Sequence, residues 1–229
     1  MVTRTGSAIV FDWDGTLIDS APLTSAIWRE QLDRYGAHVT NADVEALFGM
    51  GWPQAYRWLA ERHELPPQEM VAADLRRGRN SQRHRLALFT DTVECLAELR
   101  CHGVSLGLAT NSDAKRLQAD LDAMGLPFDW FGAVACPDAR LRAKPAPDLY
   151  LDVADQLECV PARSIAIEDT GIGARAAADA GYRVLHLVRG RPDTGPLPSK
   201  YPTISGLRAR DILARLDQTR LRLQNGGMS

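Results

Sequence analysis

Two carboxylates separated by a single residue, Asp12 and Asp14, are the most informative feature of the sequence. They follow directly on the apolar run at residues 9–11. Side chains at positions i and i+2 of an extended chain project to the same side, so both carboxylates can face one site. Gly15 then permits a sharp turn of the backbone. A purely structural alternative is that the two aspartates cap the following turn.

Two carboxylates that face one site repel each other. At ~4 Å and an effective dielectric constant near 20, the repulsion is roughly 4 kcal/mol. A bound cation removes this penalty, and oxygen ligands select a hard ion. Mg²⁺, which binds a few carboxylates together with phosphate oxygens and retained waters, fits better than zinc. The sequence therefore predicts a Mg²⁺ site at Asp12 and Asp14.

A second apolar run, at residues 104–109, ends in Thr110 and Asn111, just before a predicted helix at 114–124. A threonine hydroxyl and free backbone amides at a helix N-terminus form a suitable cradle for phosphate. The alternative for this segment is an ordinary helix cap formed by Ser112 or Asp113.

Charged residues mark two further segments. Lys144 stands between Ala143 and two closely spaced prolines, which stiffen the backbone before a helix. A lone lysine in such a place is usually a surface residue. Another apolar run, at 164–167, leads into Glu168 and Asp169, which either cap the dipole of the next helix or contribute to a metal site.

The elements that must position these side chains alternate along the chain. Apolar runs that indicate buried strands lie at 8–11, 104–109, 133–136, 164–167 and 183–188. Helical spacing of apolar residues occurs at 91–99, 114–124, 148–157 and 172–180. Strands buried on both faces and joined by helices predict an α/β fold with a doubly wound parallel sheet.

The segment 20–86 differs, because it shows helical periodicity and no convincing strand. It predicts an all-helical insertion, in which the polar, basic run at 76–85 forms a solvated helix face. Residues 190–202 are rich in proline and glycine and predict a loop. A short strand at 203–204 and an amphipathic helix ending near 223 are expected to follow.

Composition excludes several classes of function. A formal net charge of -2 offers no footprint for nucleic acid or acidic lipid. The four cysteines lack zinc or redox spacing, and no apolar run is long enough to span a bilayer. We therefore expect a cytoplasmic protein with reduced thiols and with neither a nucleic-acid nor a membrane partner.

The segment 11–20, Phe-Asp-Trp-Asp-Gly-Thr-Leu-Ile-Asp-Ser, resembles the first signature of the haloacid dehalogenase-like hydrolase superfamily. Thr110, Lys144 and the Glu168-Asp169 pair match the three later signatures in order, so the resemblance covers essentially the whole chain. It implies a Rossmann-like catalytic core at 1–19 and 87–229, with 20–86 as a helical cap over the site.

The resemblance also implies catalytic roles. Asp12 would attack phosphorus to form an aspartyl-phosphate, and Asp14 would serve as acid and base. Thr110 and the main chain of Asn111 would bind the phosphate. Lys144 would neutralise the nucleophile and the phosphoryl oxygens, as charge stabilisation in phosphoryl transfer requires. The expected enzyme is a phosphoric monoester hydrolase acting on a small phosphorylated metabolite.

The same resemblance assigns the metal ligands. Asp12, the carbonyl oxygen of Asp14 and the carboxylate of Asp169 would hold Mg²⁺. Glu168 would orient metal-bound water. The implied enzyme is therefore magnesium-dependent.

Substrate choice is expected to lie in the insertion. Gly51 and Trp52 stand where capped members of the superfamily place a substrate-contacting loop, although a turn followed by a core tryptophan is the alternative. The run at 19–22 resembles phosphoglycolate phosphatases, whereas Glu168-Asp169 resembles β-phosphoglucomutases and sugar phosphatases. Thr24 and Trp52 stand near the places where the mutases carry histidine and arginine.

Three alternatives stay open. One is a sugar phosphomutase, and another is a dehalogenase, against which Asp14 argues. The third is a catalytically silent module in which Trp28, Tyr56 and Trp58 line a protein interface, although aromatic residues at helical spacing more often pack in a core. The sequence selects neither the phosphate ester nor the oligomeric state.

Overall fold

A six-stranded parallel sheet forms the centre of the computed structural model, which describes residues 6–47, 50–189 and 201–225. The strand order is β3-β2-β1-β4-β5-β6. The strands are β1 (Ala8–Phe11), β2 (Ser105–Ala109), β3 (Ala133–Ala135), β4 (Ile165–Glu168), β5 (Arg183–Leu187) and β6 (Thr203–Ile204). The predicted doubly wound α/β class is confirmed, and so is the short strand at 203–204.

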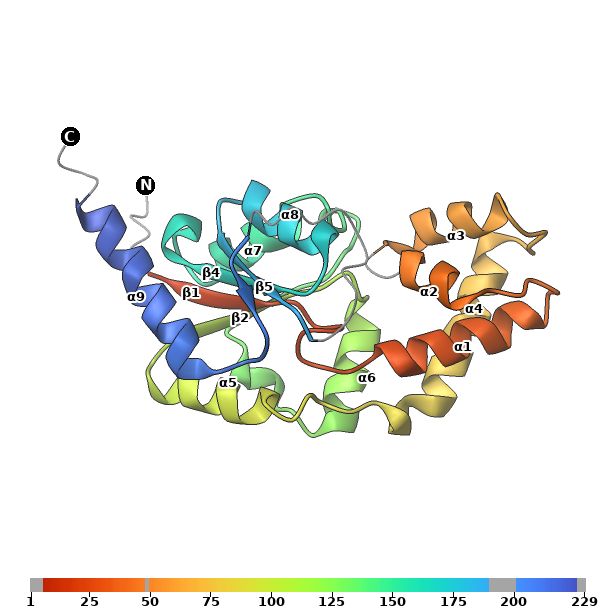
Figure 1. The fold of residues 1–229 in the computed structure, drawn as a ribbon, viewed down its shortest axis with the longest axis horizontal. Helices are drawn as coiled ribbons and strands as arrows, with labels where there is room; N and C mark the ends of the chain where they lie inside the picture. Colours follow the sequence, from red (N-terminus) through yellow and green to blue (C-terminus); the bar gives the residue numbers. More distant parts are fainter. Residues whose placement is uncertain (1–5, 48–49, 190–200, 226–229) are drawn as a thin grey trace.

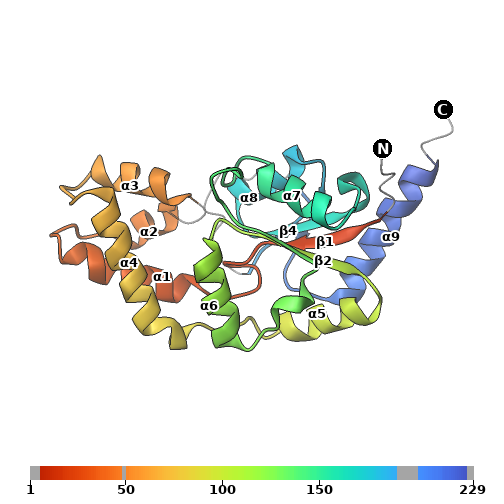
Figure 2. The same ribbon diagram turned by 180° about the vertical axis from the view of Figure 1, so that it is seen from behind.

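Helices cover both faces of the sheet (Figure 1). Helices α5 (Thr92–Cys101), α6 (Ala114–Met124) and α9 (Ala209–Asn225) lie on one face, and α7 (Asp148–Gln156) and α8 (Gly171–Asp179) lie on the other (Figure 2). Alternate residues of β1 belong to different cores: Ile9 and Phe11 pack with Leu96 of α5, whereas Ala8 and Val10 pack with Val153 of α7. The strand therefore reads as one continuous apolar run.

Local signals set the ends of helix α6. The Asp113 side chain accepts a hydrogen bond of 2.9 Å from the backbone N–H of Arg116, as expected of an N-cap. At the other end Gly125 adopts the left-handed conformation, with φ of 62°.

Short 3₁₀ turns occur at η1 (Arg83–Arg85), η2 (Phe128–Trp130) and η3 (Pro161–Arg163). Among the described residues, none of the helices combines the length and apolar character that crossing a bilayer requires.

The described residues between Asp19 and Ala87 form helices and loops with a hydrophobic cluster of their own. These helices are α1 (Ala21–Asp33), α2 (Asn41–Leu47), α3 (Trp52–Ala60) and α4 (Gln68–Gln82), and they lie at one end of the molecule (Figure 1). The backbone N–H of Asp19 donates to the carbonyl of Ala87 at 2.9 Å. The chain therefore leaves the sheet and returns to it at adjacent points.

The predicted loop at 190–202 lies largely outside the described residues. Helix α9 matches the amphipathic helix expected after it, and the predicted strand bounds differ from those observed by one residue or less. Glu168, which was expected to follow its strand, is instead the last residue of β4.

Candidate functional site

The predicted site residues meet where neighbouring strands end. Asp12 follows β1, Thr110 follows β2, and Asp169 follows β4. Strand β1 lies between the other two, so these side chains share one edge of the sheet. A cavity of about 450 Å³ lies there, and its lining includes Asp12, Asp14, Thr110, Asn111, Lys144 and Asp169, together with Gly51 and Trp52 of the insertion. Glu168 does not line the cavity and is fully buried.

A buried lysine joins two of the carboxylates. The Nζ of Lys144 lies 2.6 Å from Asp12 Oδ1 and 2.5 Å from Glu168 Oε1. The hydroxyl of Tyr150 also donates to Glu168 Oε1, at 2.5 Å. Burial by itself lowers the pKa of Lys144, but the two carboxylates outweigh it and raise that pKa above its ordinary value. Lys144 is therefore a fixed cation beside Asp12, not a surface residue.

Asn111 positions this lysine through its side chain. Its Oδ1 accepts a hydrogen bond of 2.7 Å from the backbone N–H of Lys144, and its Nδ2 donates to the Lys144 carbonyl at 3.3 Å. This paired contact fixes the loop that carries Lys144 against the end of β2. The sequence predicted a main-chain role for Asn111 and did not reveal the role of its side chain.

Three carboxylates form the acidic part of the site. Ligand atoms of Asp12, Glu168 and Asp169 lie within 4.8 Å of one another. Burial raises the pKa of Asp12 to about 7; Lys144 opposes this shift, and Glu168 adds to it. One lysine thus leaves the cluster with excess negative charge, and a hard divalent cation would compensate for it. The donor set therefore fits a metal ion bound through oxygen.

Gly15 lets the acidic residues come together. Its φ is +85°, a conformation that side-chain-bearing residues rarely adopt. A Cβ atom at this position would also collide with the carboxylate of Asp169. The glycine is thus needed both for the turn and for the close approach of the loop after β4.

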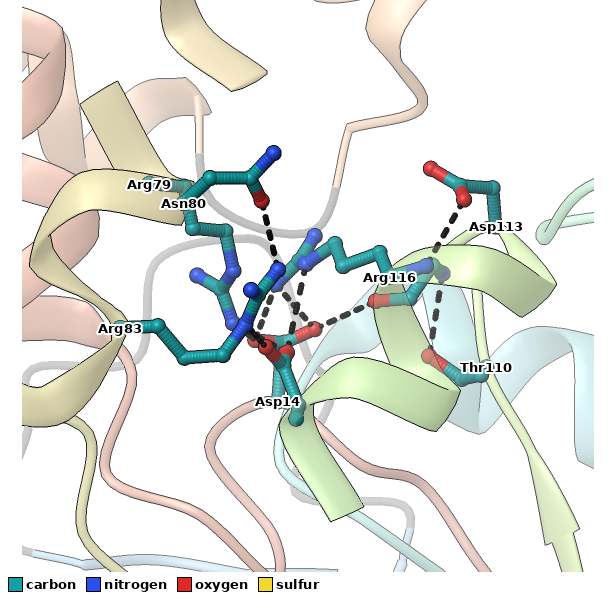
Figure 3. A network of polar contacts seen from close by, with 9 residues as sticks. Asp14, Arg79, Asn80, Arg83, Thr110, Asp113 and Arg116 are labelled. Carbon is teal, nitrogen blue, oxygen red and sulfur yellow. Dashed lines mark hydrogen bonds and ion pairs between the residues drawn. The ribbon is translucent and has the colours of Figure 1, made fainter. Parts of the chain in front are cut away.

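The side chain of Asp14 turns toward a different set of partners. Ser112 Oγ donates to it at 2.7 Å, and Arg116 Nη2 contacts its two oxygens at 2.6 and 2.8 Å (Figure 3). Arg79, from α4, approaches to 3.6 Å. Burial alone raises the pKa of Asp14, but Arg116 and Arg79, with hydrogen bonds from Ser20 and Ser112, lower it to about 2. The group is therefore ionised.

An ion-pair cluster that the sequence did not predict continues from Asp14. Asp120 of α6 is fully buried, and its carboxylate accepts from Arg79 Nη2 at 2.7 Å and from Arg83 Nε at 3.0 Å. Arg83 also contacts Asn80 within the same segment (Figure 3). The basic run at 76–85 was predicted to be solvated, and for Arg79 this prediction is wrong: its side chain is buried because it pairs with carboxylates of the core. The i, i+4 spacing of Arg116 and Asp120 was the sequence feature that could have indicated this ion-pair cluster.

Two further residues at the cavity were missed. Arg189 donates to the carbonyl of Thr16 at 3.0 Å and pairs with Asp91 at 2.9 Å, and so holds the turn that follows Asp14. His186 Nε2 lies 3.2 Å from the carbonyl oxygen of Asp169. His186 belongs to β5 and Arg189 follows it, and the apolar run of this strand predicted only core residues.

The insertion contributes aromatic side chains to the cavity. Gly51 precedes α3, and Trp52 is its first residue. The rings of Trp52 and Trp28 meet edge to face, with centroids 6.2 Å apart, and Tyr56 lies 5.8 Å from Trp52. Trp28 and Trp52 both line the cavity. Gly49, two residues before Gly51, lies outside the described residues.

Comparison with known proteins agrees with this geometry. The model of a hydrolase family described as haloacid dehalogenase-like hydrolase matches residues 7–181. The fructose-1-phosphate phosphatase YqaB of Escherichia coli K12 is 29% identical over 180 residues, which are 76% of this chain and 93% of YqaB. The bifunctional riboflavin kinase/FMN phosphatase of Arabidopsis thaliana is 26% identical over 80% of this chain, but this match spans only 48% of that relative.

A solved structure shares the whole architecture. CbbY from Rhodobacter sphaeroides, in complex with phosphate, superposes with a TM-score of 0.79 at 25% identity, covering 93% of this chain and all of CbbY. The doubly wound core and its inserted helices are thus common to both proteins. The family model alone spans most of the described sheet. The resemblance seen in the sequence is confirmed: the chain belongs to the haloacid dehalogenase-like hydrolase family.

Proposed function

We propose that this hydrolase is a phosphatase that cleaves the phosphate monoester of a small metabolite. The observation that carries the proposal is the contact between the buried Lys144 ammonium and Asp12, in a cavity also lined by Thr110 and Asp169. A fixed cation beside a carboxylate suits a nucleophile that must approach an anionic phosphoryl group. The enzyme class agrees with the family and with the phosphatase activity named for YqaB.

The acidic cluster would hold Mg²⁺. We assign Asp12, Asp169 and the main-chain carbonyl of Asp14 as its ligands, with Glu168 behind them. When bound, the ion neutralises charge on the phosphoryl group and on the carboxylates. Glu168 already accepts from Lys144 and Tyr150, so its main contribution is to hold the lysine in place.

Asp12 would attack phosphorus in line. The new O–P bond yields an aspartyl-phosphate while the bond to the alcohol oxygen breaks, and water then hydrolyses the intermediate. Lys144 balances the negative charge as Asp12 approaches the phosphoryl oxygens. Thr110 and the backbone of Asn111 lie at the edge of the sheet where these oxygens would be bound.

Asp14 would protonate the departing alcohol and then accept the proton of the attacking water. With its pKa held at about 2 by the two arginines, the carboxyl group is too acidic for that exchange at neutral pH. Its role therefore requires the contacts with Arg116 and Arg79 to loosen when substrate binds. Since Arg79 belongs to α4, closure and opening of the insertion would change this contact.

We also propose the division into two domains that the sequence predicts. Residues 1–19 and 87–229 would form the catalytic core, and 20–86 the cap that contacts the remainder of the substrate. The support is the separate hydrophobic cluster of the insertion and the adjacent positions at which the chain leaves and re-enters the sheet.

The substitution Asp12→Asn tests the proposal. It keeps the shape of the side chain but removes the nucleophilic charge, so turnover of p-nitrophenyl phosphate should fall at least about a thousandfold, toward the non-nucleophilic background. Asp122→Asn, on the exposed face of α6, is the matched control and should retain activity. Chelation with EDTA should abolish wild-type activity, and added Mg²⁺ should restore it. Retained activity in Asp12→Asn, with native circular dichroism, would contradict the assignment.

A further inference from the structure

The cavity has two chemically different parts. Its floor, at the edge of the sheet, carries the carboxylates and Lys144 described above. Its roof is formed by the insertion and is largely apolar, with the lining residues Ile27, Trp28, Val44, Leu47, Met50, Trp52, Ala55, Ala72 and Leu75. Four of these side chains, those of Ile27, Val44, Leu47 and Ala55, are buried. The part of the cavity that must receive the alcohol side of the ester is therefore mostly hydrocarbon.

The polar groups of this roof are few. Among the described residues they are Ser20, Thr24 and Arg76, together with Arg79, which already pairs with Asp120 and Asp14. The indole Nε1 of Trp52 is buried and has no hydrogen-bond partner among the described residues. A polyol would lose water from several hydroxyl groups and find few partners here, and each unpaired hydroxyl weakens binding. An apolar group would instead gain from burial against the same side chains.

We infer, on the basis of the proposed phosphatase activity, that the alcohol released by this enzyme is carried on an apolar, ring-bearing group with few polar atoms. The cavity volume of about 450 Å³ lies within the range of small-molecule sites. The two tryptophans, meeting edge to face, provide a wall suited to an aromatic or alicyclic ring. One acceptor on the ligand would satisfy the Trp52 indole N–H.

A matched pair of esters tests this inference. In 2-phenylethyl phosphate and sorbitol 6-phosphate the same bond, to a primary alcohol, is cleaved, so the intrinsic chemistry is alike. We expect kcat/KM to favour the phenylethyl ester by at least about tenfold, because discrimination follows from binding of the leaving group. Equal values, or preference for the sorbitol ester, would overturn the inference.

A pair of tryptophan substitutions locates the preference. Trp52→Ala should reduce the ratio of the two kcat/KM values about tenfold or more, by removing buried apolar contact with the ring. Trp58→Ala truncates a tryptophan in the same hydrophobic cluster that does not line the cavity, and should leave the ratio unchanged. Trp52→Phe, which preserves a ring, provides the comparison if the alanine variant does not fold. An unchanged ratio in a folded Trp52 variant would contradict the location.

Binding separates this inference from the proposed activity. Calorimetric titration of Asp12→Asn with each ester measures recognition without turnover. If the wild type hydrolyses neither these esters nor p-nitrophenyl phosphate, the phosphatase proposal fails, yet tighter binding of 2-phenylethyl phosphate would still support the apolar site. Tighter binding of sorbitol 6-phosphate, or equal binding, would refute the site even if both esters are hydrolysed.

Discussion

Replacing Asp120 with asparagine removes the charge at the centre of the cluster that joins the insertion to α6. Its carboxylate is fully buried and accepts from Arg79 and Arg83, with Arg116 Nε at 3.6 Å. Asparagine has nearly the same size, so the change leaves packing almost intact. What remains is a buried Arg79 whose nearest described carboxylate is then Asp14, at 3.6 Å.

The expected cost follows from this geometry. Removing one partner of a buried ion pair typically costs about 3–5 kcal/mol, because the other charge stays buried without compensation. Arg83 is partly exposed and Arg79 still approaches Asp14, so the lower end, about 3 kcal/mol, applies. Domains of this kind have total stabilities of about 5–15 kcal/mol. The substitution should therefore remove a substantial share of the free energy of unfolding.

Urea denaturation, followed by tryptophan fluorescence and by circular dichroism, measures this loss. With an m-value of about 3 kcal/mol per molar urea, the unfolding midpoint should fall by about 1 M. Asp122→Asn, on the exposed side of the same helix, should change stability by less than about 0.5 kcal/mol. If Asp120→Asn lowers stability by less than about 1 kcal/mol, or by no more than its control, the cluster does not stabilise the junction as inferred.

Two other perturbations test the geometry. Gly15→Ala introduces a strained φ and a collision with Asp169, so phosphatase activity should fall at least about a hundredfold. Gly36→Ala, at φ +74° and with no atom within 4 Å of the added Cβ, should only lower stability by about 1 kcal/mol. Equal activities of the two variants in a phosphatase assay would refute the reasoning. Iodoacetamide at pH 7.5 should modify the exposed Cys101 and spare Cys95, because burial raises the pKa of the Cys95 thiol to about 12. Detection of Cys95 adducts by mass spectrometry of the folded, treated protein would contradict this.

The sequence predicted the features that depend on local pattern. Buried strands show as continuous apolar runs, and polar residues at their carboxyl ends must share one edge of a parallel sheet. The structure accordingly brings Asp12, Thr110 and Asp169 to one cavity, although their chemical roles stay predictions. Position before the helix narrowed the cap of α6 to Ser112 or Asp113, and the structure assigns it to Asp113.

Contacts between segments far apart in the sequence could not be predicted from local sequence pattern. Arg79 and Asp120 are 41 residues apart, and nothing in the basic run distinguishes the buried Arg79 from its exposed neighbours Arg76 and Arg77. A helix face is solvated or buried according to what packs on it, and here the partner is α6. The side-chain role of Asn111 was missed for the same reason, because Lys144 is brought beside it only by the fold.

The backbone N–H of Asp19 donates to the Ala87 carbonyl and that of Phe89 to the Leu17 carbonyl, so the two segments that bound the insertion lie side by side. An exchange of the insertion by recombination would leave the strand order unchanged, but it would also remove Arg79 and Arg83 and leave the buried Asp120 without these partners. Any replacement insert must therefore supply cations at the same place, which limits the inserts that this sheet can accept.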